Sequence, residues 1–169
     1  MEQKGFWREG LLHVFLVVVL VVADQLTKVW ARTGLADAPL VIWKNVFSFC
    51  LIYNTGGAWG IFHKHTWALT VFSVVVMAAI VAGYLWLPKV KEIRPLRYSI
   101  VLITAGAVGN IIDRIVFGKV TDMFSFDLIN FPVFNVADIC IVCGCILAGI
   151  LLVFYYKDED FDKWKKSNS

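Results

Sequence analysis

Charged residues are scarce in this sequence. Of its 169 residues only 17% are Asp, Glu, Lys or Arg, whereas 59% are hydrophobic, and the mean hydropathy is +0.72. A soluble domain could not cover so much apolar surface, so a bilayer must solvate the excess. The basic residues form no stripe typical of nucleic-acid binding. We therefore expect one membrane-embedded domain over residues 1–169, in contact with membrane lipids and without a nucleic-acid partner.

Histidine is also rare. His13, His63 and His65 are too scattered for a zinc site, and no His-Glu-x-x-His motif occurs. Of four cysteines, three lie in one apolar run near the C-terminus, and because cysteine is small and readily buried we interpret them as core-packing residues. A metal or redox Cys-x-x-Cys site at Cys140 and Cys143 is the alternative. We expect neither a metal nor a cofactor.

Long apolar runs are what the sequence has in abundance. A helix needs about 20 mostly apolar residues to cross the hydrocarbon core. Four segments qualify, at residues 11–31, 66–87, 97–117 and 135–156. The first could instead be a cleaved signal peptide, since Lys4 and Arg8 precede its apolar run. We favour a span because the apolar pattern resumes after Lys28. The predicted fold class is an all-α integral membrane protein with four transmembrane helices.

Basic residues near the ends of the predicted spans indicate the orientation. Ten lie on one side: Lys4, Arg8, Lys89, Lys91, Arg94, Arg97, Lys157, Lys163, Lys165 and Lys166. Four lie on the other: Arg32, Lys44, Lys64 and Lys119. The positive-inside bias predicts that both termini are cytoplasmic.

The loop 32–65 between the first two spans has a pattern of its own. Segments 39–43 and 46–53 are rich in β-branched and aromatic residues, and Lys44-Asn45 between them favours a turn. We predict a small extracytoplasmic β element on the membrane surface. The glycines Gly56 and Gly57 then break the pattern, which suggests tight turns or close approach of the backbone to a ligand.

Charge inside a span is costly and marks either function or structural pairing. The charged residues within the predicted spans are Asp24, Lys28, Asp113, Arg114 and Asp138. At 1.5 Å per residue, Asp24 lies about 9 Å before the outer end of its span and Asp113 about 6 Å before the end of its own. Asp138 comes about 5 Å after the start of the last span. The three carboxylates reach one level, where Asp122 in the last outer loop can join them.

Amide side chains reach the same level. Asn110 precedes Asp113 by three positions, Asn135 precedes Asp138 by three, and residues at that spacing share a helical face. Asn54 arrives from the outer loop. A structural explanation stays open, in which Asp24 with Lys28, and Asp113 with Arg114, are ion pairs alone; for Asp24 and Lys28 we favour it.

Carboxylates are the only well-supplied catalytic groups at this level. Ser–His chemistry would need a nearby histidine, and His13 lies toward the wrong end of its span. Two carboxylates close together cannot both ionise cheaply, so they share a proton, and one acts as base while the other acts as acid. Such a pair activates water against a carbonyl.

Five short stretches together resemble the bacterial lipoprotein signal peptidase (signal peptidase II) family over nearly the whole chain. They are Asp24-Gln-Leu-Thr-Lys28, Asn54-Thr-Gly-Gly-Ala-Trp59, Gly106-Ala-Val-Gly-Asn-Ile-Ile-Asp-Arg114, Val120-Thr-Asp-Met-Phe124 and Phe134-Asn-Val-Ala-Asp138. The resemblance implies an aspartic endopeptidase of the bacterial inner membrane. It implies cleavage of signal peptides from prolipoproteins before a diacylglyceryl-modified cysteine, and we expect a monomer.

The resemblance also implies residue roles. It places a catalytic dyad on Asp122 and Asp138. Substrate-binding or site-ordering roles fall on Asn54, Gly56, Asn110, Arg114 and Asn135. Supporting roles fall on Asp24, Lys28 and Asp113. The region 39–53 would be the family's small sheet that cradles the substrate.

The chain departs from the family pattern at four positions, which concern substrate fit more than the reaction. Tyr53 stands where a basic residue is common, Gly57 where alanine is usual and Thr121 where valine is common. An acidic residue often occupies the position of Ser125.

Two other functions remain open. A small transporter or proton-coupled carrier could use intramembrane carboxylates, but a proton relay needs titratable groups spread through the membrane depth. The span 66–87 has no charged residue, and the other spans are polar mainly near their outer ends. A purely structural membrane protein would have no use for a polar cluster assembled from separate spans.

Overall fold

The computed structural model describes residues 2–56, 66–88, 90–129, 131–157, 159 and 160. It contains the helices α1 (Glu2–Gly34), α2 (Thr66–Trp86), α3 (Arg94–Phe117) and α4 (Val136–Ile150), the last continued by a π-helical turn, Leu151–Tyr155. Each is long and apolar enough to cross a bilayer, which confirms the prediction of four spans. Gly57, His63, His65 and Lys64 lie outside the described residues, as do residues 161–169.

Two of the helices begin at other residues than the predicted spans do. The helix α1 begins at Glu2, well before residue 11, so the basic residues Lys4 and Arg8 lie on the helix itself. The helix α4 begins at Val136, and Asn135 is its N-cap, with extended backbone. Asn135 therefore does not share a helical face with Asp138, although the side chain of each residue accepts the backbone N–H of the other.

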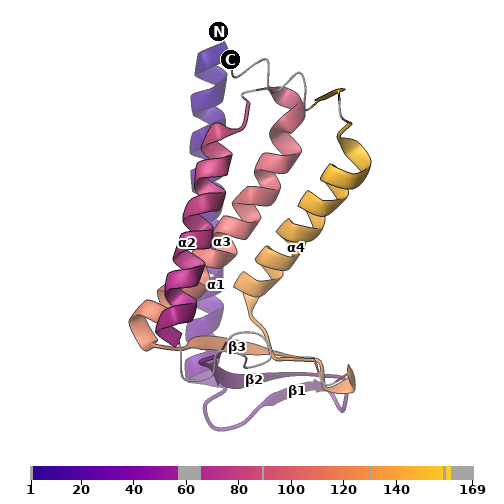
Figure 1. Cartoon of the computed structure of the whole chain (residues 1–169). Coiled ribbons are helices and arrows are strands. Elements are labelled where there is room, and N and C mark those ends of the chain that lie inside the picture. Colours follow the sequence, from indigo (N-terminus) through magenta and orange to yellow (C-terminus); the bar gives the residue numbers. More distant parts are fainter. Residues whose placement is uncertain (1, 57–65, 89, 130, 158, 161–169) are drawn as a thin grey trace.

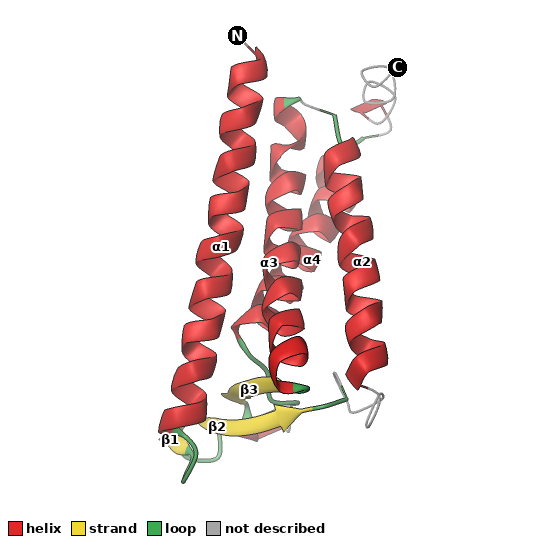
Figure 2. Ribbon diagram, turned by 90° about the vertical axis from the view of Figure 1, so that its left-hand side faces the viewer, coloured by secondary structure: helices red, strands yellow, loops and turns green. Residues whose placement is uncertain are grey.

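The four helices form a bundle with a small sheet at one end (Figure 1). The start of α1 and the end of α4 both lie at the opposite end from the sheet, as four crossings require. Figure 2 shows α3 in the middle of the bundle, and α3 contacts each of the other three helices. No residue of α2 is buried within the protein, so this helix is the most peripheral.

Glycine allows α3 and α4 to approach closely. A Cβ added at Gly106 would collide with the carbonyl oxygen of Ala137, and one added at Gly144 would lie 2.8 Å from the carbonyl oxygen of Ser99. Small residues at such a contact are the usual way for membrane helices to bring their backbones together. This contact places the start of α4 beside the C-terminal half of α3.

The sheet has the order β1-β2-β3 and is antiparallel throughout. Strands β1 (Leu40–Trp43) and β2 (Phe47–Asn54) are the predicted β element, and Asn45 adopts positive φ in the turn between them. The third strand, β3 (Val120–Ser125), was not predicted. It follows α3 directly, after Gly118 has ended that helix in the left-handed conformation.

Strand β3 changes the placement of Asp122. The sequence suggested that Asp122 lies in a loop, and that expectation is wrong. Asp122 lies within β3 opposite Ile52 of β2, and it is 1% exposed. A strand paired along its length fixes the backbone of this residue before any substrate arrives.

The glycine contact between α3 and α4 generates a prediction. Gly106→Ala should lower the thermal unfolding temperature in detergent, because the added methyl group meets backbone and forces the two helices apart. The matched control is Gly83→Ala in α2, where nothing lies within 4 Å of an added Cβ. The control should be neutral or slightly stabilising, since alanine favours a helix over glycine by about 1 kcal/mol. An equal effect of both substitutions would contradict the close-packed contact.

Candidate active site

A buried lysine lies at the centre of the polar residues. Lys28 of α1 is 0% exposed, and its Nζ lies 2.8 Å from Asp24 Oδ2 and 3.7 Å from Asp113 Oδ2. The same ammonium donates to Asn110 Oδ1 at 3.0 Å and to the carbonyl oxygen of Gly109 at 3.4 Å. A charged group that is buried away from water needs such partners, and here one cation is balanced by two carboxylates.

Gln25 completes this buried group and was missed in the sequence. Its Nε2 donates to Asp24 Oδ2 at 3.1 Å, Asp113 Oδ1 at 3.2 Å and the carbonyl oxygen of Gly109 at 3.1 Å. Gly109 must lack a side chain, because an added Cβ would lie 2.5 Å from Asp24 Oδ2. The signal available in the sequence was an amide beside Asp24 inside an apolar span.

Asp113 does not pair with Arg114, so that proposed ion pair is wrong. The cations near Asp113 are Lys28 and Arg32, the latter with Nη1 3.8 Å from Asp113 Oδ2. Asp113 Oδ2 also accepts the backbone N–H of Thr121 at 2.8 Å, which ties α3 to β3. Asp113 therefore connects α3 to the strand that carries Asp122.

Asp24 holds the start of α4. Its Oδ1 accepts the backbone N–H of Ala137 at 2.9 Å, while its Oδ2 meets Lys28. The N–H groups of a first helical turn have no partner within the helix, so a carboxylate there is favourable. The helix that carries Asp138 is thus anchored to α1, as Asp113 anchors β3 to α3.

Asn135 joins the two candidate catalytic carboxylates. Its Nδ2 donates to Asp122 Oδ1 at 2.6 Å, and its backbone N–H donates to Asp138 Oδ2 at 3.1 Å. In return, Asn135 Oδ1 accepts the backbone N–H of Asp138 at 2.9 Å, which completes a capping box at the start of α4. One residue, 0% exposed, thereby fixes Asp122 and Asp138 relative to each other.

Two further amides orient the same carboxylates. Asn110 Nδ2 donates to Asp138 Oδ1 at 2.8 Å, and Asn54 Nδ2 donates to Asp122 Oδ2 at 3.1 Å. The backbone N–H of Gly56 donates to Asn54 Oδ1 at 3.0 Å and sets which way that amide faces. Each of the four carboxylate oxygens of Asp122 and Asp138 therefore accepts at least one hydrogen bond from the protein.

Burial and the neighbouring carboxylate act together on Asp122. Burial, and after it the charge of Asp138, raises the pKa of Asp122 from 3.8 to about 7. The hydrogen bonds from Asn54 and Asn135 favour the ionised form and oppose that shift. A carboxyl group with such a pKa holds its proton at a pH where an ordinary aspartate would have lost it.

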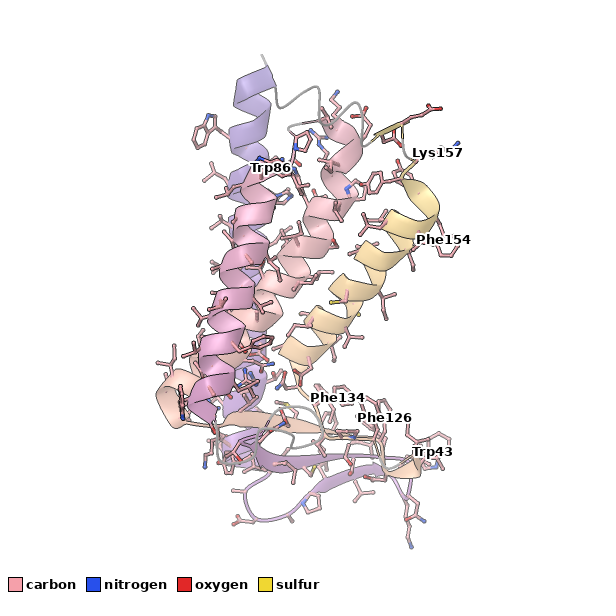
Figure 3. The ribbon with its side chains drawn as sticks, in the orientation of Figure 1. Trp43, Trp86, Phe126, Phe134, Phe154 and Lys157 are labelled. Carbon is pink, nitrogen blue, oxygen red and sulfur yellow. The ribbon has the colours of Figure 1, made fainter. Side chains whose placement is uncertain are left out.

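Both carboxylates open into one cavity of about 530 Å³. Its polar lining comprises Asn54, Asn110, Arg114, Asp122 and Asp138. Its apolar wall includes Phe126, Ile129, Phe131, Phe134, Ile139 and Val142. Figure 3 shows Phe126 and Phe134 between the sheet and the start of α4, and their rings stack with centroids 5.6 Å apart.

Arg114 is the cation of this cavity. Its guanidinium makes no hydrogen bond or ion pair with any residue that the structure describes, whereas the other cations of the site are paired. A planar guanidinium offers forked donors that match a carbonyl or a carboxylate. Arg114 is placed to contact a bound molecule.

The cysteines differ from the prediction. Cys140 is buried, as a core-packing residue should be, but Cys143 and Cys145 are exposed on α4, and Cys143 lines the cavity. A run that is apolar all round hides which side faces the core, so this misassignment follows from the sequence pattern. Within the described parts of the chain, no group of three or more His, Cys, Asp or Glu side chains could hold a metal ion.

Comparisons with known proteins identify the family of this chain. The family described as signal peptidase (SPase) II matches residues 16–154. A lipoprotein signal peptidase of Clostridium acetobutylicum is 38% identical over 158 residues, covering 89% of this chain and 98% of its own. One of Lactococcus lactis subsp. lactis is 40% identical over 147 residues, covering 85% and 94%.

Two solved structures of bacterial membrane enzymes have a similar fold. One titled as a bacterial membrane enzyme structure at 2.3 Å resolution superposes with a TM-score of 0.73 at 27% identity, covering 86% of this chain and 92% of its own. A second, at 1.9 Å resolution, gives a TM-score of 0.71 at the same identity. With the family matched over most of its length, this chain belongs to the signal peptidase II family and is a membrane-embedded protease.

Proposed function

We propose that this protein cleaves signal peptides from prolipoproteins before a diacylglyceryl-modified cysteine, with Asp122 and Asp138 as a catalytic dyad that shares one proton. The observation that carries the proposal is the bridge made by Asn135, which donates to both carboxylates. Two buried carboxylates held close together are costly in free energy unless one of them is protonated. The raised pKa of Asp122 supports that protonation near neutral pH.

The reaction follows from one carboxylate and one carboxylic acid. The ionised aspartate takes a proton from a water molecule, whose oxygen attacks the carbonyl carbon of the scissile peptide bond. The protonated aspartate donates to the carbonyl oxygen, which gives a tetrahedral diol. The diol's hydroxyl proton then returns to one aspartate while the leaving nitrogen accepts a proton from the other. The C–N bond breaks, and the dyad again holds one proton.

The apolar wall suits a lipid-modified substrate. Ile139 and Val142 line the cavity and are 41% and 54% exposed, so the cavity extends to the lipid-facing side of α4. A peptide carrying acyl chains can enter from the bilayer with those chains against apolar side chains. Arg114 is then free to hold a peptide carbonyl beside the dyad.

The polar residues elsewhere argue against a proton-coupled carrier. His13 is buried and hydrogen-bonded to Tyr84 Oη at 2.7 Å, toward the other end of α1. Eleven positions separate His13 from Asp24, about 16 Å along the helix, and residues 14–23 are all apolar. A proton relay needs groups within reach of one another, and this part of α1 provides none.

We infer that the sheet faces the outside of the bacterial inner membrane and that both termini are cytoplasmic. The support is the excess of basic residues at the end away from the sheet. In a variant without the native cysteines, Lys44→Cys in the exposed turn should react with an impermeant maleimide in intact cells. Glu92→Cys, exposed at the other end, should react only after lysis. The reverse pattern would contradict this orientation.

The dyad is tested by removing each carboxylate in turn. Asp122→Asn, Asp138→Asn and the double variant should each lose nearly all cleavage of a lipid-modified precursor, to a similar degree, because either change leaves no acid–base pair. Asp24→Asn and Asp113→Asn should lose only part of the activity, partly through lower stability. Near-parental cleavage by a folded Asp122→Asn or Asp138→Asn variant would contradict the assignment.

A further inference from the structure

Arg32, in the last turn of α1, joins three elements near the site. Its Nη1 donates to Thr121 Oγ1 of β3 at 2.9 Å and lies 3.8 Å from Asp113 Oδ2 of α3. Its guanidinium carbon lies 4.5 Å from the ring centroid of Phe117. The side chain is only 18% exposed, so these contacts are largely removed from water and worth more than a surface ion pair.

Each polar group of Thr121 takes part in a hydrogen bond. Its hydroxyl accepts from Arg32, its N–H donates to Asp113 and its carbonyl oxygen accepts from Asn135 Nδ2 at 3.3 Å. The residue is 1% exposed. The next residue is Asp122, so the plane of the Thr121–Asp122 peptide determines where the Asp122 carboxylate points.

The contacts of Arg32 and Thr121 converge on one atom. Asp113 Oδ2 receives the Thr121 N–H and lies near both Arg32 and Lys28. If the Arg32–Thr121 hydrogen bond were lost, Asp113 would keep the N–H of Thr121, and β3 would keep its pairing with β2. The strand would then remain folded and would keep the packing of Met123 against Ala31 of α1, but it would lose its hydrogen bond from Arg32.

We propose that Arg32 and Thr121 form a positioning pair that holds β3 so that the Asp122 carboxylate meets Asp138 and the substrate at the geometry needed for cleavage. Neither side chain lines the cavity, so neither contacts the substrate. The pair acts through Asp122, on the rate of the chemical step. This inference rests on the proposed function. Thr121 is also one of the positions where this chain departs from the family pattern. The sequence suggested that this departure concerns substrate fit, but its hydroxyl accepts from Arg32 beside Asp122, so we assign it to the reaction instead.

The experiment measures kcat and KM separately, on a lipid-modified precursor in mixed micelles. Thr121→Val keeps the shape and the backbone N–H but removes the hydroxyl, and kcat should fall about tenfold or more with little change in KM. Thr121→Ser retains the hydroxyl and should restore kcat to near the parental value. Arg32→Met should resemble Thr121→Val. Because the Arg32–Thr121 hydrogen bond is already absent from each single variant, the double variant should be no worse than the poorer single variant.

Arg94→Met serves as the control. It removes an arginine from an ion pair with Glu9 at the far end of the bundle, where Arg94 is 47% exposed, and it should leave kcat unchanged. The inference is overturned if Thr121→Val keeps its kcat, if Thr121→Ser does no better than Thr121→Val, if the effect lies in KM alone, or if the losses of the two single variants multiply in the double. Failure of the parent protein to cleave the precursor would instead overturn the proposed function itself.

Discussion

The buried ammonium of Lys28 is the interaction on which the rest of the site depends. It lies between α1 and α3, and its neighbours Asp24 and Asp113 each use a carboxylate oxygen to hold another element. Asp24 holds the start of α4 through Ala137, and Asp113 holds β3 through Thr121. Removing one partner of a buried ion pair typically costs about 3–5 kcal/mol. Here it would also release the two elements that carry the dyad.

This arrangement separates the charges that build the site from the charges that we propose to react. Asp24 and Asp113 form ion pairs with buried or half-buried cations. For Asp24, a structural ion pair with Lys28 was the interpretation favoured from the sequence. Asp122 and Asp138 receive hydrogen bonds from amides instead, at Asn54, Asn110 and Asn135. An amide donor orients a carboxylate, but it does not hold the group in its ionised form as a paired cation would. Such a carboxylate can gain and lose a proton during turnover.

The sequence predicted the parts of the fold that depend on local patterns. Apolar runs long enough to span gave four helices, and the helical rise gave a common level for Asp24, Asp113 and Asp138. The turn at Lys44-Asn45 and its flanking strands were also visible. Strand β3 was not, because it is short, contains an aspartate and forms only by pairing with β2, about 70 residues earlier.

The remaining wrong predictions concern which neighbouring residue a polar side chain contacts. Asn135 was expected on the same helical face as Asp138, yet it bonds Asp138 as an N-cap. Asp113 was expected beside Arg114, yet it meets Lys28 and Arg32. Sequence spacing shows which side chains lie on one face of a helix, but not how that helix is rotated against the others. The positions of Arg32 and Gln25 in the site needed the packed structure.

Carbon-13 NMR of aspartate-labelled protein tests directly whether Asp122 holds a proton near neutral pH. The folded state should retain a proton on Asp122 between about pH 4 and 7, where the unfolded chain has lost it, so this group's contribution to stability falls as the pH rises through that window. We predict one side-chain carboxyl signal with a midpoint near pH 7, absent in Asp122→Asn. The midpoint should be higher in Asn54→Ala, because that amide favours the ionised form of Asp122. A spectrum in which every aspartate is already ionised at pH 5 would contradict the shared proton.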